Sequence, residues 1–386
     1  MGETGMKVLL LYDYPPSPSG LATQGNLLHR GLQEMGVDVH SVHFESAQEK
    51  EWYYRWFGPD VVLGVGYWGH THHLVLHPQR YGIKAIVPWL VADGYMANYH
   101  EVLESLRLVL VTSKWVKSVY VRDGLKGVNI EVLPVGCDTD AFIPRDRNDP
   151  KVAAVRDSLG VAPDQVMILT VGGDATSKGA QEVMQALALI DTKAPDWKYI
   201  CKVWPQPRTN QQNYIDMQLA SQLGIDKNVV YATNIISRNF MPYLMAACDI
   251  YAAPSRLEGF GMTQVEANAC GKPVIGIRAM GMLDTMVHGE TAFLARVAQE
   301  VRMRETMVGD EAGYQPGHRV VFRSPRVVDY RASVHDIADY LLKLMENAKL
   351  RKTIGEAGRK RVVQNFDYRI IARQFTKIIS EKLGIS

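Results

Sequence analysis

A glycine-containing turn with two glutamates has residue types and spacing that could do chemistry. Glu258 and Glu266 stand where a strand ends in a loop that opens a helix, with Glu266 about two helical turns into that helix. Gly259 and Gly261 carry no side chain, so backbone N–H groups can approach a ligand, and the amino end of the helix favours an anion. The two acids can therefore flank one bound molecule, and sugar hydroxyls beside a diphosphate fit these groups.

The same stretch resembles a family signature. Glu258-Gly-Phe-Gly-x-x-x-x-Glu266, preceded by Pro-Ser, is similar to the E-x7-E signature of retaining glycosyltransferases of family four. The resemblance implies that Glu258 contacts a donor sugar and that Glu266 holds the ribose hydroxyls of a nucleotide diphosphate sugar. It also implies donor contacts along the turn and the first helical residues, at Gly259, Phe260, Gly261, Met262 and Thr263.

A second loop, Val171–Gly179, resembles the phosphate-binding segment of that family with one departure. Lys178 matches the lysine that grips the donor diphosphate and is a candidate catalytic residue, but Gly173 stands where the family has an arginine. One of the two cations expected to stabilise the leaving group is therefore absent. Lys202 and Arg208 are candidates to replace it as donor contacts, although both residue types are also common on protein surfaces.

Two further candidates lie in the first half of the chain. Ser19-Gly20 matches the glycine-rich loop after the first strand, which makes Gly20 a candidate donor contact. Ala92 stands where the resemblance places a catalytic-face histidine, and Asp93 lies beside it. Asp93 is therefore either a contact for the outer hydroxyls of the sugar or an aspartate that caps a loop.

Other motifs are weaker. Gly64–Gly69 satisfies the dinucleotide pattern G-x-G-x-x-G, but it follows a later strand and carries two bulky aromatic residues. Asp138-Thr-Asp140 imitates a metal site, although a turn is favoured there. The histidines between positions 70 and 77 lack the companion residues of a metal motif. We expect neither a metal nor a cofactor other than the donor.

Apolar runs that alternate with helical stretches must position these residues. An unbroken apolar run of this kind is typical of a strand buried on both faces of a parallel sheet. Expected strands cover Lys7–Tyr12, Val37–Phe44, Val61–Val65, Ala85–Val91, Leu108–Thr112, Ile130–Pro134, Val166–Val171, Tyr199–Val203, Val229–Ala232, Ile250–Ala253 and Pro273–Ile277. The sequence therefore predicts an α/β protein of the GT-B type, with two doubly wound, Rossmann-like domains facing each other across a cleft.

A polar, proline-bracketed linker at 144–150 sets the expected domain boundary. The bounds are 1–148 for an acceptor-side domain, 149–365 for a nucleotide-sugar-binding domain, and 366–386 for a C-terminal helix packing back on the first domain. Residues 298–328 carry mixed charge and several glycines, which indicates an insertion or a flexible loop.

Composition excludes several classes of protein. The 386 residues are 47% hydrophobic and 22% charged with a net charge of +2, so neither disorder nor a nucleic-acid partner is indicated. Four widely spaced cysteines predict buried, reduced thiols and a cytoplasmic location. No apolar run is long enough to span a membrane. The aromatic run 52–57 is assigned to helix packing, with a peripheral membrane contact or an acceptor contact left open.

The leading hypothesis is a retaining hexosyltransferase, as the resemblance implies. It would move a hexosyl group from a UDP- or GDP-sugar to the hydroxyl of a carbohydrate or other acceptor. Glu258, Lys178 and Asp93 are the candidate catalytic residues. One alternative is a sugar phosphorylase or epimerase of the same architecture. The other, motivated by Gly173, is a nucleotide-sugar-binding protein with weak or no transfer.

Overall fold

The computed structural model describes residues 5–205 and 207–385, with the side chains of 207–210 and 311 also left out. The chain divides into two compact units, each built from separate segments. Unit 1 comprises Met1–Gly136, Arg302–Val328 and Asn365–Ser386, and unit 2 comprises Cys137–Val301 and Asp329–Gln364.

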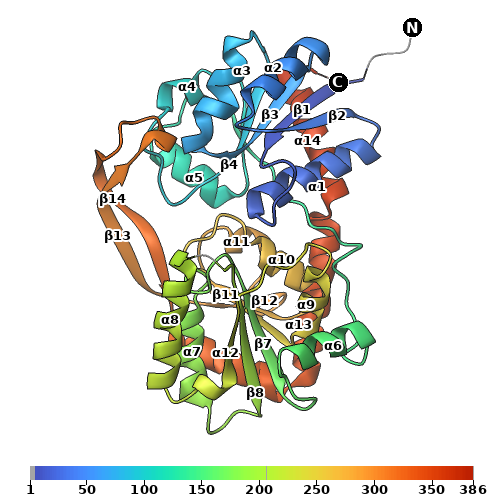
Figure 1. The fold of residues 1–386 in the computed structure, drawn as a ribbon, viewed down its shortest axis with the longest axis vertical. Coiled ribbons are helices and arrows are strands. Elements are labelled where there is room, and N and C mark those ends of the chain that lie inside the picture. Colours follow the sequence, from blue (N-terminus) through green and yellow to red (C-terminus); the bar gives the residue numbers. More distant parts are fainter. Residues whose placement is uncertain (1–4, 206, 386) are drawn as a thin grey trace. The chain divides into compact units, whose positions relative to one another are not determined.

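Unit 1 is built on a six-stranded parallel sheet with the order β2-β1-β3-β4-β5-β6 (Figure 1). Its elements are β1 (Lys7–Tyr12), α1 (Gly20–Glu34), β2 (Asp38–His43), α2 (Ala47–Trp56), β3 (Val61–Tyr67), the 3-10 helix η1 (Trp68–His70), the π-helix η2 (His72–Leu76), α3 (His77–Arg80), β4 (Ile86–Val91), α4 (His100–Glu104), β5 (Val109–Val111), α5 (Lys114–Arg122), β6 (Ile130–Val132), the 3-10 helix η4 (Asp310–Ala312) and α14 (Tyr368–Leu383).

Unit 2 repeats the doubly wound pattern with the strand order β12-β11-β10-β7-β8-β9, again with parallel pairing between the strands. Its elements are α6 (Pro150–Ser158), β7 (Val166–Val171), α7 (Ala180–Ile190), β8 (Trp197–Lys202), α8 (Pro207–Gln222), the 3-10 helix η3 (Asp226–Asn228), β9 (Val229–Ala232), α9 (Met241–Ala247), β10 (Ile250–Ala252), α10 (Met262–Ala269), β11 (Val274–Ile277), α11 (Met282–Thr285), β12 (Ala292–Ala295), α12 (Val334–Glu346) and α13 (Ala348–Asn365).

Burial and capping explain why these elements form. All six residues of β7 are buried, as expected for a strand covered on both faces. Ser19 caps α1, because its hydroxyl accepts a hydrogen bond from the Ala22 N–H at 3.1 Å, and Ser113 caps α5 by bonding to Val116 in the same way. The predicted strands are therefore confirmed, with ends that differ by one or a few residues.

The segment expected to be an insertion or flexible loop is instead an ordered hairpin. β13 (Val297–Val308) and β14 (His318–Ala332) form a separate two-stranded sheet, visible as a long ribbon in Figure 1. Most β13 side chains are exposed. Val301, Met303 and Met307 alternate with the polar residues Arg302, Arg304 and Thr306, which is the period-2 pattern of a strand.

The remaining core features agree with the sequence. Cys137, Cys201, Cys248 and Cys270 are buried free thiols. α14 packs on α1 within unit 1, where Gly31 brings its backbone close to Ala372 and the Tyr368 hydroxyl donates to Glu34 at 2.6 Å. None of the helices in the described ranges is both long and apolar enough to span a bilayer.

Candidate donor site in unit 2

Strand order places two of the predicted loops next to each other. β7 pairs with β8 on one side and β10 on the other, so successive chain connections run in opposite directions from β7. Ligands in open α/β sheets bind at such a switch point, beyond the carboxyl ends of the strands. The loop after β7 carries Lys178 and the loop after β10 carries Glu258, so the fold brings these two candidates together.

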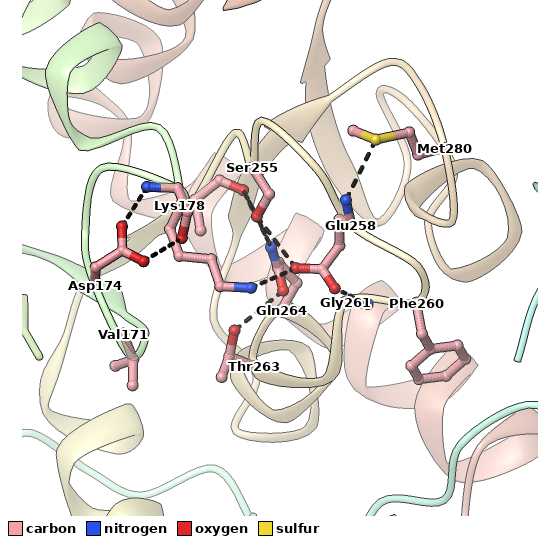
Figure 2. A network of polar contacts seen from close by, with 12 residues as sticks. Val171, Asp174, Lys178, Ser255, Glu258, Phe260, Gly261, Thr263, Gln264 and Met280 are labelled. Atoms are coloured by element: carbon pink, nitrogen blue, oxygen red, sulfur yellow. Dashed lines mark hydrogen bonds and ion pairs between the residues drawn. The ribbon is translucent and has the colours of Figure 1, made fainter. Parts of the chain in front are cut away.

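Figure 2 shows Lys178, Ser255 and Gly261 converging on the carboxylate of Glu258. The Lys178 ammonium donates to Oε2 at 2.7 Å, and the Ser255 hydroxyl donates to the same oxygen at 3.3 Å. The other oxygen accepts the Gly261 N–H at 3.1 Å. Both oxygens are therefore held in place on a side chain that is only 13% exposed.

These contacts set the charge state of Glu258. Burial by itself raises the pKa of a carboxyl group, but the Lys178 charge and the hydrogen bonds from Lys178, Gly261 and Ser255 together lower the pKa of Glu258 below its usual value. Glu258 is therefore a carboxylate at neutral pH.

Local backbone geometry shapes the loop that carries Lys178. Asp174 accepts hydrogen bonds from the Ser177 N–H at 2.6 Å and from the Ser177 hydroxyl at 2.9 Å, which closes a turn. Gly179 has a φ of +85° and begins α7, and a Cβ there would approach the Pro254 carbonyl oxygen to 2.5 Å. Only glycine fits this close approach between the two loops.

The turn after Glu258 is equally constrained. Gly261 precedes α10 with a φ of +94°, and its N–H is the one bound to Glu258. Gly281 donates its N–H to the Glu258 carbonyl at 3.1 Å, and a Cβ on Gly281 would meet the Gly259 carbonyl oxygen at 2.1 Å. The Gly261 N–H, predicted to bind sugar hydroxyls, is thus already used within the turn.

Glu266, on α10, lies apart from this network and has a different partner. It is 3% exposed, and one carboxylate oxygen is hydrogen-bonded to the Arg238 guanidinium, which also packs over the Phe142 ring at 4.8 Å. The second oxygen, Oε2, is buried without a hydrogen-bond partner. A buried acceptor of this kind can accept a hydrogen bond from a hydroxyl group of a ligand.

The structure also describes the residues around the missing cation, Lys202 and Gly173. Lys202 is buried, not on the surface, and its ammonium donates to the carbonyls of Val203 at 2.8 Å and of Asn234. Burial lowers its pKa. A Cβ on Gly173 would meet no atom within 4 Å, so the loop has room for a side chain there. The side chain of Arg208 lies outside the described residues.

The remaining predicted donor contacts are spread between the units. Phe260, Met262 and Thr263 lie in the turn and first helical positions beside Glu258, with Phe260 buried and the other two half-buried. Gly20, the first residue of α1, and Asp93, two residues after β4, belong to unit 1.

Sequence reasoning missed a buried carboxylate beside the loop that carries Lys178. Asp216 on α8 is fully buried and accepts hydrogen bonds from the hydroxyls of Thr176 at 2.6 Å and Tyr231 at 2.7 Å, and from the Gln181 amide at 2.7 Å. Thr176 and Gln181 flank Lys178. No sequence signal indicates this role, because the partners come from three separate segments.

Arg238 and Arg256 were also missed. Arg238 is hydrogen-bonded to Glu266, and Arg256, two residues before Glu258, pairs with Glu182 of α7 at 2.9 Å. The buried Arg256 guanidinium therefore joins the loop after β10 to α7.

The weaker motifs have structural roles. A Cβ on Gly64 would meet Leu74 at 2.7 Å, so the glycine-rich stretch after β3 accommodates side-chain packing. Asp138 accepts hydrogen bonds from the N–H groups of Asp140 at 3.3 Å and Ala141 at 3.0 Å, which confirms the turn. Within the described ranges, no three histidine, cysteine or acidic residues gather as a metal site would require.

Comparisons with known proteins place this geometry in a family context. Residues 152–303, which include both site loops, match the family described as Glycosyl transferases group 1. A D-inositol 3-phosphate glycosyltransferase of Rhodococcus erythropolis is 29% identical over 271 residues, covering 67% of this chain. The matched part spans 60% of that relative's own length.

The likeness to solved structures extends well beyond residues 152–303. Sucrose-phosphate synthase of Thermosynechococcus elongatus has a TM-score of 0.74 at 18% identity, covering 99% of this chain and 100% of its own. HepE of Anabaena, solved with UDP and glucose, has a TM-score of 0.71 at 18% identity, covering 97% and 99%. The likeness covers both units, and the GT-B fold predicted from the sequence is confirmed.

Proposed function

We propose that this protein transfers a hexosyl group from a nucleotide diphosphate sugar to a hydroxyl acceptor, with retention at the anomeric carbon. The observation that carries the proposal is the pairing of Lys178 with Glu258 at the switch point of unit 2. Lys178 offers a cation for a diphosphate, and Glu258 offers a fixed carboxylate for sugar hydroxyls. The solved HepE structure contains UDP and glucose, and the group 1 relatives are glycosyltransferases, which supports this class of donor.

In the proposed reaction, charge develops on the diphosphate as the bond to the sugar breaks. Lys178 sits on a loop whose shape is fixed by Asp174, and α7 begins two residues later at Ala180. A preorganised cation and helix terminus stabilise the leaving group without reorganising during the reaction. Donor binding must therefore draw Lys178 partly away from Glu258 toward phosphate, leaving the carboxylate available to sugar hydroxyls.

Glu266 is assigned to the ribose. Its Oε2 is buried and has no partner in the absence of ligand, whereas the other oxygen is fixed by Arg238. A ribose hydroxyl would satisfy the unpaired oxygen. Asp93 in unit 1 is assigned to the outer hydroxyls of the transferred sugar. We also propose a cytoplasmic location, which the buried free thiols support.

Replacing Glu266 by alanine tests the donor assignment. Titration of the wild-type protein with UDP, GDP and ADP by calorimetry first identifies the base that binds. With that nucleotide, Glu266→Ala should weaken binding about tenfold or more, because a charge-assisted hydrogen bond contributes roughly 1.5–3 kcal/mol.

A control variant removes a glutamate from another helix of the same unit. Glu346→Ala removes an exposed glutamate from the end of α12 and should leave nucleotide affinity unchanged. Undiminished affinity in Glu266→Ala would remove the ribose role. Nucleotide binding without transfer to any hydroxyl acceptor would instead favour the binding-protein alternative that Gly173 motivates.

A further inference from the structure

The β13–β14 hairpin has structured contacts at both of its ends. Its base, around residues 329–332, belongs to unit 2, and its tip, around residues 308–326, belongs to unit 1. Each end can therefore be described within its own unit. At each end the hairpin contacts a segment adjacent to a residue assigned to the proposed transfer reaction.

At the base, the hairpin joins the loop that carries Glu258. The Tyr330 N–H donates to the Arg256 carbonyl at 2.8 Å, two residues before Glu258 in the chain. Arg331 pairs with Glu182 at 3.2 Å, and the same carboxylate is held by Arg256. Glu182 is thus a nearly buried carboxylate with guanidinium groups on two sides, one from the donor loop and one from the hairpin.

The Arg256 backbone extends this connection to the phosphate loop. Its N–H donates to the Ser177 carbonyl at 2.9 Å, next to Lys178. Removing one cation from a buried carboxylate destabilises the folded protein. Arg331 therefore contributes to holding Glu182 and Arg256 in place. The position of the donor loop therefore depends in part on the base of the hairpin.

At the tip, the hairpin holds the segment that follows Asp93. Residues 94–99 form neither helix nor strand, so their backbone groups need partners from elsewhere. The Tyr314 hydroxyl donates to the Ala97 carbonyl at 2.9 Å, and the Asn98 amide donates to the Ala312 carbonyl at 2.8 Å. The Tyr95 and Phe322 rings pack edge to face, with their centroids 5.3 Å apart.

A buried ion pair also joins the tip of the hairpin to unit 1. Arg326 lies 2.8 Å from one Asp123 oxygen, and the other Asp123 oxygen accepts the Met96 N–H at 2.8 Å. The approach is also sterically close, because a Cβ on Gly313 would meet the Tyr99 hydroxyl at 2.1 Å. The tip therefore supplies hydrogen bonds, ring packing and an ion pair to one irregular segment.

We propose that the β13–β14 hairpin is a positioning element with two ends. Its base holds the Arg256–Glu182 pair beside the loop that carries Glu258 in unit 2. Its tip holds residues 94–99, which follow Asp93 in unit 1. The hairpin residues contact no reacting atom in this proposal, and they act through the loops that they hold. The catalytic consequence rests on the proposed function, whereas the effect on loop order does not.

The two ends are tested separately by hydrogen exchange of the full chain, measured by mass spectrometry. Gly313→Ala should speed exchange in peptides covering 94–99 by about fivefold or more, since loss of a local contact favours local opening. Gly317→Ala is the matched control, because Gly317 has nearly the same positive φ as Gly313 but no atom closer than 3.9 Å to a Cβ. Tyr314→Phe, which removes only the hydroxyl, serves if Gly313→Ala does not fold.

For the base, Arg331→Gln should speed exchange in peptides covering 254–261 and leave 94–99 unchanged. Arg319→Gln removes an exposed arginine of the same hairpin, paired with Glu305, and should change neither region. Equal exchange in Gly313→Ala and Gly317→Ala, and in Arg331→Gln and Arg319→Gln, would overturn the proposal.

Steady-state kinetics then measure the effect of each variant on the transfer reaction. Arg331→Gln should raise the donor KM by about tenfold, and Tyr314→Phe should lower kcat about threefold or more with a donor KM within about twofold of wild type. Changes in exchange as expected, in a protein that transfers no sugar, would leave the hairpin's role in loop order supported and would refute the proposed transfer function.

Discussion

Gly173 is the residue at which the phosphate loop departs from the family pattern. The structure makes this departure testable, because a Cβ added at that position would meet no atom within 4 Å. Gly173→Arg should therefore fold normally and strengthen nucleoside diphosphate binding by about tenfold, as an added charge-assisted contact to phosphate would. Calorimetric titration with UDP and GDP measures the effect.

Gly173→Gln is the control for Gly173→Arg, since it adds a side chain of comparable length without the charge. A gain seen equally in both variants would assign the effect to packing. No gain in either would mean that Lys178 and the helix terminus already supply what the diphosphate requires.

The Lys178–Glu258 pair makes stability depend on pH. The pKa of Glu258 is lowered in the folded protein, so its contribution to stability is present above the unfolded value, about 4.3, and is lost as pH falls through the folded value. In Lys178→Met burial dominates and raises the pKa of Glu258. The variant should therefore lose about 1–3 kcal/mol of unfolding free energy at pH 7 and progressively less towards pH 3.

Urea unfolding at several pH values measures this difference between wild type and Lys178→Met. Lys193→Met, which removes an exposed lysine from unit 2, should show no such trend. A difference that stays constant between pH 7 and pH 3 would contradict the assignment of the low pKa to Lys178.

At the scale of elements, α8 is connected to the phosphate loop through Asp216. Both carboxylate oxygens accept hydrogen bonds, so an amide in their place must direct its NH₂ group at a donor. Asp216→Asn should cost about 1–3 kcal/mol of stability and should also weaken nucleotide binding, because Thr176 and Gln181 flank Lys178. Denaturation and calorimetric titration measure the two effects.

Tyr231→Phe provides the comparison for Asp216→Asn. It removes one donor from the carboxylate but leaves Thr176 and Gln181 bound, so it should lower stability while nucleotide affinity stays close to wild type. Equal losses of affinity in both variants would mean that Asp216 acts on overall stability and not on the loop.

At the scale of the whole molecule, the sequence predicts the fold better than it predicts the contacts. The buried strands are recognisable as apolar runs, and the loops that carry Lys178 and Glu258 follow β7 and β10, which is why both residues could be singled out from the sequence. The burial of Lys202 was not foreseen, because a lysine is rarely buried and the Asn234 carbonyl reaches it through tertiary structure. Asp216 was missed for the same reason, since its hydrogen-bond partners come from other segments of the chain.

The route of the chain between the units has a consequence for protein engineering. The chain passes from one unit to the other after Gly136, Val301, Val328 and Gln364. A chimaera made by joining two relatives at a single point near residue 136 would therefore combine the hairpin tip and α14 of one parent with the first sheet of the other. A functional exchange must carry residues 302–328 and 365–386 together with the first 136 residues.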